Sequence, residues 1–204
     1  MNTDTQNTMT AKKTPPTLGS IRPSLCFYHA NPKGTGSAVK MNLHPAHDYT
    51  DGCIMLKIAN QMTVGNPMGP NPTFATFDWE NAMNVKLDFS DLCQMLQVFR
   101  GECESINDEK GLYHRSPLGV TRITLGHLVE LAPGYRLGVY RSSQKGREND
   151  THASILLSPA EALGLCEALA GSLYLVAFGI PMLVPHDTTA YKAQTREMRN
   201  ANAA

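Results

Sequence analysis

The stretch 74–101 constrains the fold most, because the spacing of its apolar residues changes from every second position to helical spacing. The first part has the pattern of a strand with one buried and one solvated face, carried by Met83, Val85, Leu87 and Phe89. The second part has helical spacing, carried by Leu92, Leu96, Phe99 and Cys103. Ser90 lies between them as a candidate N-cap, and Asp91 falls in the first turn, where a helix favours an anion. The stretch therefore predicts a strand followed directly by a helix.

The same sequence of events recurs near the end of the chain. Residues 155–157 lead into Ser158-Pro159-Ala160-Glu161, a capping box with proline at the first helical position. Alternation and turn signals predict the remaining strands, so the expected strands are 24–29, 37–44, 54–58, 83–89, 112–115, 120–128, 135–140 and 155–157. We therefore expect an α+β fold of two pseudo-repeated antiparallel four-stranded sheets, each followed by a helix.

Composition predicts where the folded part lies. Residues 1–22 and 181–204 are polar and poor in apolar side chains, so we expect both to be tails outside the core. Between them, residues 23–180 would form one domain, with a first repeat over about 23–104 and a second over about 111–180. The expected last helix, over 158–179, has two apolar faces. One face can cover the sheet, which leaves the other for a second helix of the same chain or of a neighbouring subunit.

Charge and cysteine content bear on the class of partner and on the cellular compartment. Lys and Arg together equal Asp and Glu at 18 each, so the net charge gives no argument for or against a polyanionic partner. The five cysteines are odd in number and widely spaced, which favours buried free thiols in a reducing compartment. We find no run of about 20 apolar residues and no secretory signal at the start. These features predict a soluble, cytoplasmic protein with no membrane partner, nucleoid-associated in a prokaryote or virus, with an organelle as the alternative.

Several short motifs resemble one known family. They are Lys33 to Pro45 (KGTGSAVKMNLHP), Phe77-Asp78-Trp79, Leu112-Tyr113-His114, Pro133 to Tyr140 with its glycine-aromatic strand, and the closing Phe178-Gly179. Together with the layout, they resemble the whirly family of single-stranded nucleic-acid binders, which includes plant whirly proteins and guide-RNA annealing proteins of kinetoplast mitochondria. The resemblance covers residues 24–180. It implies homo-oligomers, tetramers in the family, packed through the helices, with single strands threaded along the outer faces of the sheets.

The chemistry of such a surface suggests which residues would carry the binding. A single strand is held where cations follow the phosphates and aromatic side chains stack on the bases. The candidate nucleic-acid-binding residues are Lys33, Lys40, Lys57, Phe74, Trp79, Arg122, Arg136, Tyr140, Arg141 and Lys145. Trp79 is equally open to interpretation as a core anchor. The expected function is a single-stranded DNA-binding protein of little sequence specificity that protects or organises strands in replication, recombination, repair or transcription.

Three alternatives stay open. RNA in place of DNA is one, because stacking platforms accept both. A structural adaptor that binds no nucleic acid is another, and the neutral net charge favours it. A divergent nuclease is the third alternative, because His44, His47 and Asp48 are residue types that bind a divalent ion. We find no GxSxG, P-loop or GxGxxG motif, so we expect no enzyme, no cofactor and no metal.

Overall fold

The computed structural model describes residues 24–46, 50–116, 119–128, 133–143 and 150–179. The predicted tails 1–22 and 181–204 lie outside these residues. The elements in chain order are β1 (Ser24–His29), β2 (Ser37–His44), β3 (Cys53–Thr63), β4 (Thr76–Phe77), β5 (Met83–Leu87), α1 (Phe89–Phe99), β6 (Leu112–Ser116), β7 (Gly119–Leu128), β8 (Gly134–Ser143), β9 (Thr151–Leu157) and α2 (Pro159–Phe178). The predicted α+β fold of two antiparallel sheets, each followed by a helix, is confirmed.

Sheet one has the strand order β1-β2-β3-β5, and the short β4 pairs with the far end of β3. Strand β3 is longer than the predicted 54–58 because the buried amide of Gln61 replaces apolar burial there. Its Oε1 accepts hydrogen bonds from the backbone N–H groups of Asn31 and Gly36, and its Nε2 donates to the carbonyl oxygen of Asn31. These bonds tie the end of β3 to the turn between β1 and β2.

Helix α1 begins two residues earlier than predicted. Its N-cap is Asp88, whose carboxylate accepts from the N–H of Asp91, while the Asp91 carboxylate accepts from the N–H of Asp88. The expectation that Ser90 caps the helix was therefore wrong, because the reciprocal capping box fixes the start at Asp88. Phe89 belongs to the helix rather than to the strand, and Cys103 lies beyond its end.

Sheet two has the order β6-β7-β8-β9 and is antiparallel throughout. The capping box predicted before α2 is confirmed, with Ser158 as N-cap, Pro159 in the first turn and Glu161 reaching back to the N–H of Ser158. Of the apolar positions on this helix, Leu165, Cys166 and Leu169 are buried. Leu163 is exposed, so the second apolar face is uncovered in the described residues.

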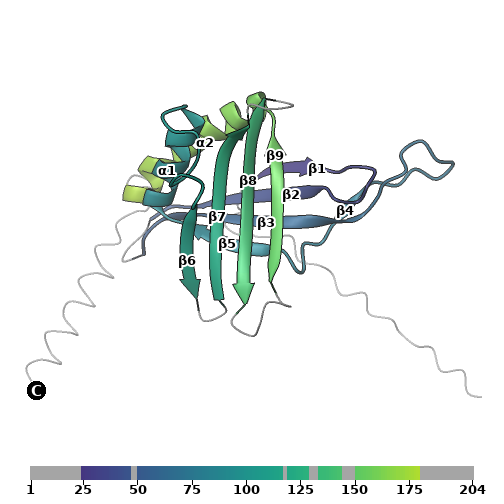
Figure 1. Ribbon diagram of the computed structural model, residues 1–204, viewed down its shortest axis with the longest axis horizontal. Helices are drawn as coiled ribbons and strands as arrows, with labels where there is room; N and C mark the ends of the chain where they lie inside the picture. The colour runs from purple at the N-terminus through teal and green to yellow at the C-terminus, as the bar shows by residue number, and fades with distance from the viewer. Residues whose placement is uncertain (1–23, 47–49, 117–118, 129–132, 144–149, 180–204) are drawn as a thin grey trace, which may run out of the picture.

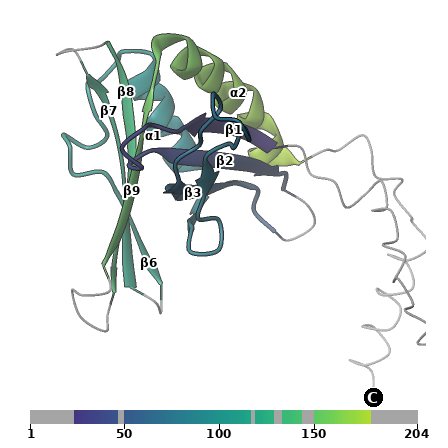
Figure 2. The ribbon, with the colours of Figure 1, turned by 90° about the vertical axis from the view of Figure 1, so that its right-hand side faces the viewer.

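The strands of the two sheets run across each other (Figure 1). Turned by 90°, the molecule shows sheet two edge-on, with sheet one leading away from it and both helices in the angle between the sheets (Figure 2). The core fills this angle and draws on both sheets and both helices, with Leu56, Leu92, Ile123 and Leu165 fully buried. Each sheet therefore keeps one face turned away from the core.

Polar contacts fix the two repeats against each other. They are Ser37 Oγ to the carbonyl of Ser154 (2.6 Å), Asn60 Nδ2 to the carbonyl of His152 (3.0 Å), His29 Nε2 to Glu161 Oε1 (2.7 Å) and His114 Nε2 to Asp91 Oδ2 (3.1 Å). Partial burial of Glu161 opposes its ionisation, but hydrogen bonds from His29 and Ser158 outweigh this and lower the pKa of its carboxyl. The strand order and these contacts together hold the outer faces of the sheets in a fixed relation.

Two sequence expectations need correction. All five cysteines are free, but Cys103 is exposed and only Cys53 and Cys166 are buried, so burial of all the thiols was wrong. Helix α2 is also long and apolar enough to span a membrane by length and composition. One such helix is weak evidence, because core helices meet the same criterion, and five of its side chains are buried in this fold.

Candidate functional site

Three lysines gather on the outer face of sheet one. Lys40 on β2 lies directly opposite Lys57 on β3, and Lys86 on β5 lies opposite Met55, two residues from Lys57 along β3. Their neighbours along each strand are buried, so alternation turns all three side chains away from the core. Among the described residues, none of the three forms an ion pair with a carboxylate. Sequence reasoning missed Lys86, although its place between buried Val85 and Leu87 gave the same signal.

Three aromatic rings adjoin these lysines. Tyr28 packs against Phe77 at 5.7 Å between ring centroids and edge-on against Trp79 at 6.3 Å. The Lys57 ammonium lies 5.9 Å from the centroid of the Trp79 ring. A hydrogen bond with the Cys26 thiol, with some burial, raises the pKa of the Tyr28 hydroxyl, which therefore stays neutral. Trp79 is half-buried and belongs to this outer cluster rather than to the core. We call Lys40, Lys57, Lys86, Tyr28, Phe77 and Trp79 the lysine-aromatic face.

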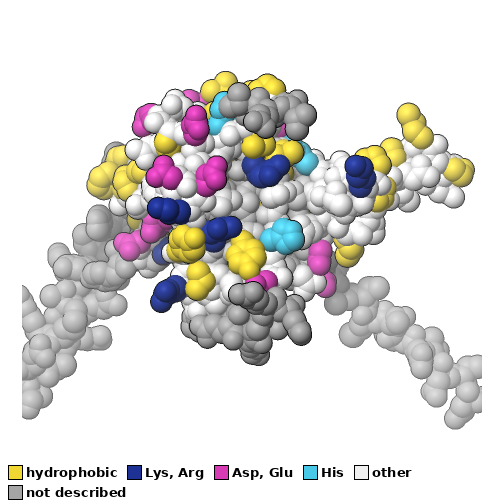
Figure 3. Space-filling view, viewed as in Figure 1, with side chains coloured by type: hydrophobic (Ala, Val, Ile, Leu, Met, Phe, Trp, Pro, Cys, Tyr) yellow, Lys and Arg dark blue, Asp and Glu magenta, His cyan; other side chains and the backbone are white. Residues whose placement is uncertain are grey.

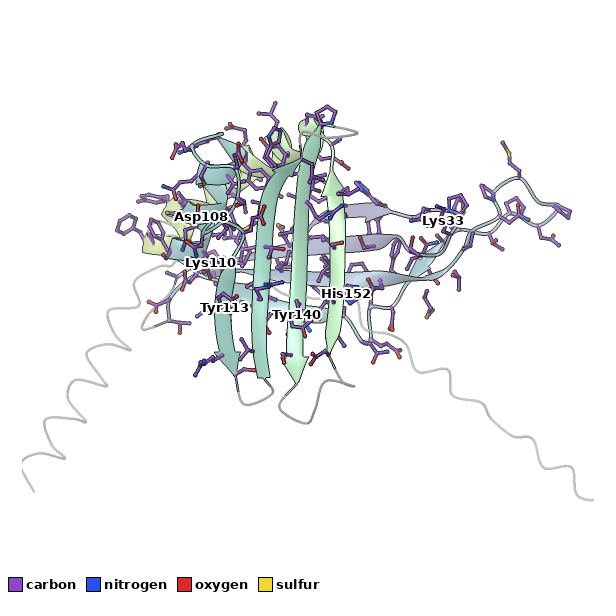
Figure 4. The ribbon with its side chains drawn as sticks, viewed as in Figure 1. Lys33, Asp108, Lys110, Tyr113, Tyr140 and His152 are labelled. Atoms are coloured by element: carbon purple, nitrogen blue, oxygen red, sulfur yellow. The ribbon has the colours of Figure 1, made fainter. Side chains whose placement is uncertain are left out.

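The structure places Lys33 and Phe74 apart from this face. Lys33 is exposed in the turn between β1 and β2, and Figure 4 shows it beside the arm that extends from sheet one. Phe74 is 82% exposed on that arm. It helps to line a largely apolar pocket of about 270 Å³, together with Pro32, Val64 and Pro67. Residues 58–77 contain no charged side chain, and Lys33 directly follows Pro32, which lines the pocket.

Sheet two places Arg122, Arg136 and Tyr140 on its outer face, with Arg122 directly opposite Tyr140 and Arg136 four residues from Tyr140 along β8. The guanidinium carbon of Arg122 lies 5.9 Å from the centroid of the Tyr140 ring. Tyr113 on β6 and His152 on β9 share this face, and sequence reasoning missed both. Tyr113 follows buried Leu112, and His152 precedes buried Ala153, so strand alternation could have placed both on the outer face. Figure 3 shows basic, aromatic and histidine side chains side by side here.

Arg141 does not belong with them. It shares its side of β8 with buried Val139, and its side chain bonds to other parts of the protein. Its Nε donates to Thr121 Oγ1 (3.1 Å), and its Nη2 donates to the carbonyl oxygen of Asn84 (2.8 Å). The expectation that Arg141 shares the outer face with Arg136 and Tyr140 is therefore wrong, because its side chain lies on the other side of β8 and bonds to β5 of the other sheet. Lys145 lies outside the described residues.

A polar hollow of about 330 Å³ separates the two outer faces. Its lining includes Asp78 and Asn81 from sheet one's side and Asp150 and His152 from sheet two's side. Hydrogen bonds from the side chain and backbone of Asn81 lower the pKa of Asp78, which therefore stays charged at neutral pH. The hollow carries negative charge between two faces that carry cations.

The histidine-rich loop gives no metal centre in the part of the chain that the structure describes. His44 is half-buried at the end of β2, whereas His47 and Asp48 lie outside the described residues. No group of three or more histidine, cysteine or acidic side chains is arranged to hold a metal ion among the described residues. The nuclease alternative therefore gains no geometric support.

Comparison with solved structures identifies the architecture. The fold matches the crystal structure of WHY1 from Arabidopsis thaliana with a TM-score of 0.61, over 92% of this chain and 95% of that one. The chain has the whirly fold. It also matches WHY3 from Arabidopsis thaliana with a TM-score of 0.59, over 90% of this chain and 98% of that one. Sequence identity is 14% in both cases, and no family model and no curated protein sequence matches the chain. The whirly fold predicted from the motifs is thus confirmed by structure alone.

Proposed function

We propose that this protein binds single-stranded nucleic acid, preferentially DNA and with little sequence specificity. The observation that carries the proposal is the lysine-aromatic face, where Lys57 lies over the Trp79 ring and Lys40 lies directly opposite Lys57, neither in an ion pair among the described residues. Ammonium groups on a strand surface attract phosphates, and exposed ring faces stack on bases that are not paired. The whirly fold supports this function as an analogy between folds.

Strand organisation during replication, recombination, repair or transcription is the role we propose. A binder that reads backbone and stacking rather than base edges suits this role, because it accepts any exposed strand. Location in the cytoplasm or on a nucleoid and the lack of enzymatic activity stay predictions.

We also propose that the protein assembles with itself through α2. Leu163, Tyr174 and Phe178 on this helix are 65%, 58% and 70% exposed, and large exposed apolar clusters mark interaction surfaces. Sedimentation of the Leu163→Asp variant tests the idea. We expect a smaller particle than the unsubstituted protein, and an unchanged particle would refute assembly through this helix.

Fluorescence anisotropy with labelled single-stranded DNA, single-stranded RNA and duplex DNA tests the main proposal. We expect preference for single strands, and affinity that falls log-linearly with salt by about 0.7 per neutralised phosphate. The double variant Lys40→Gln, Lys57→Gln should reduce that slope by about 1.4, for two phosphates. Arg100→Gln at the end of α1 is the control, because it removes a positive charge from a helix end that is not part of the lysine-aromatic face.

Absence of binding to all three probes by the folded protein would refute the proposal and favour the adaptor. Equal or tighter binding of RNA would move the preferred ligand from DNA to RNA.

A further inference from the structure

A row of four side chains crosses the whole outer face of sheet two. Strand register places Tyr113 opposite Arg122, Arg122 opposite Tyr140, and Tyr140 opposite His152. Their neighbours along the strands, including Ile123 and Val139, are buried, so all four side chains point away from the core. Figure 4 shows Tyr113, Tyr140 and His152 at the same height across the sheet. We call these four residues the cross-strand row.

The spacing within the row is set by the sheet. Neighbouring strands lie about 4.8 Å apart, so the two tyrosines, on β6 and β8, are about 10 Å apart with Arg122 between them. Stacked bases of one strand rise only about 3.4 Å each. Two bases that stack on these two rings must therefore be unstacked from each other, which only an extended single strand allows.

Arg122 carries an unused donor. Its Nε is buried and has no hydrogen-bond partner among the described residues, although buried donors are almost always paired. The guanidinium also lies against the Tyr140 ring. Because the Nε is buried, the terminal N–H groups of this planar guanidinium are the donors that a phosphate joining two bases would meet on the outer face.

The surroundings favour the same arrangement. The next row along the sheet is Thr124, Gly138 and Ser154, which are small. A Cβ atom on Gly138 would come within 2.7 Å of Thr124 Oγ1, so this position has no room for a side chain and the floor beside Tyr140 stays flat. The Tyr140 hydroxyl donates a hydrogen bond to the Asp150 carboxylate, which orients the ring. Asp150 directly precedes β9, on the side of β8 opposite to β7, which carries Arg122.

We propose that the cross-strand row is a dinucleotide site: two consecutive bases of a single strand stack on Tyr113 and Tyr140, and the phosphate between them is held by Arg122. This rests on the proposed function, but it names a second surface that is separate from the lysine-aromatic face. Because duplex bases cannot splay apart in this way, the row would also contribute to the preference for single strands.

Anisotropy with a labelled thymidine oligonucleotide tests the row. Tyr113→Ala and Tyr140→Ala should each weaken binding by about 5- to 150-fold, the range that stacking of one base gives. Both alanine variants should leave the salt slope unchanged, because they remove no cation. Tyr113→Phe keeps the ring and should bind within about twofold of the unsubstituted protein, which also controls for folding. Arg122→Met should lower the salt slope by about 0.7, for one phosphate.

Photocross-linking of the full chain to an iodouridine-containing oligonucleotide supplies a second readout. We expect cross-links at Tyr113 and Tyr140, and none at the control Phe89, an exposed aromatic residue on α1. Binding that depends on Lys40 and Lys57 but changes less than twofold in both alanine variants, without cross-links to the row, would overturn this inference and leave the proposed function standing. Failure of the unsubstituted protein to bind any strand would overturn both.

Discussion

The two arginines on neighbouring strands of sheet two should respond to substitution in opposite ways. Arg141→Met removes two hydrogen bonds from a half-buried guanidinium, one to Thr121 and one to the carbonyl of Asn84 in the other sheet. A hydrogen bond to a charged group contributes about 1.5 to 3 kcal/mol, and the one to Asn84 is exposed to competing water. We therefore expect the free energy of unfolding to fall by about 2 to 4 kcal/mol in total. For a domain of this size, that is a drop in Tm of about 4 to 16 °C.

Urea and thermal unfolding measure this loss, and Arg122→Met is the matched variant. Arg122 lies on the outer face and its Nε has no partner to lose, so its replacement should change the free energy of unfolding by less than about 0.5 kcal/mol. The affinity for a single strand should fall more in Arg122→Met than in Arg141→Met. Unchanged unfolding of Arg141→Met together with weakened strand binding would refute the reasoning and return Arg141 to the binding surface.

Three further predictions concern the scaffold. Urea unfolding of the single and double variants Asp91→Asn and His114→Gln should give a coupling free energy of about 0.5 to 3 kcal/mol, since the two side chains are 3.1 Å apart. Additive effects of the two substitutions would mean that the contact contributes nothing to stability. Folding lowers the pKa of Glu161, so its contribution to stability is present above its ordinary pKa of 4.5 and is lost as pH falls through the folded value. Glu161→Gln should accordingly flatten the acid limb of the urea midpoint against pH, and an unaltered limb would contradict this. Glu109 has φ 67°, so Glu109→Gly should raise the free energy of unfolding by about 1 kcal/mol in thermal melts, and an unchanged melt would contradict this.

Local periodicity was enough to predict most of the elements. The alternation over Met83 to Leu87 and the capping box at Ser158 both appear in the structure where the sequence placed them. These signals are local, because a strand or a helix start depends on residues two to four positions apart. The first helix start was harder, since Asp88 and Ser90 can both act as caps. The choice follows from Asp91, whose side chain reaches the N–H of Asp88.

The candidate site likewise has a part that local sequence predicts and a part that it does not. Strand parity alone places Arg136 and Tyr140 outside and sets Arg141 on the side of buried Leu137 and Val139, so the error over Arg141 was avoidable. Its partner Asn84, 57 residues away, was not predictable, because nothing local relates the two sheets. The cross-strand row also depends on contacts that are distant in the sequence. Each residue has the right parity, but only the register of three strand pairs brings Tyr113, Arg122 and Tyr140 into line.

A net charge of zero is compatible with a polyanionic ligand once the charges are located on the fold. Charges separated by more than about 8 to 10 Å are screened at physiological salt, so a strand responds to the face that it touches rather than to the total. The lysine-aromatic face presents three lysines without carboxylate partners among the described residues. Several of the balancing acids lie elsewhere, with Glu102, Glu104, Asp108 and Glu109 after α1. Asp78, between Phe77 and Trp79, and Asp150, bonded to Tyr140, line the hollow at the border of the two faces. This segregation favours two separate stretches of strand, one on each sheet, because a phosphate chain that crossed the hollow would meet both aspartates.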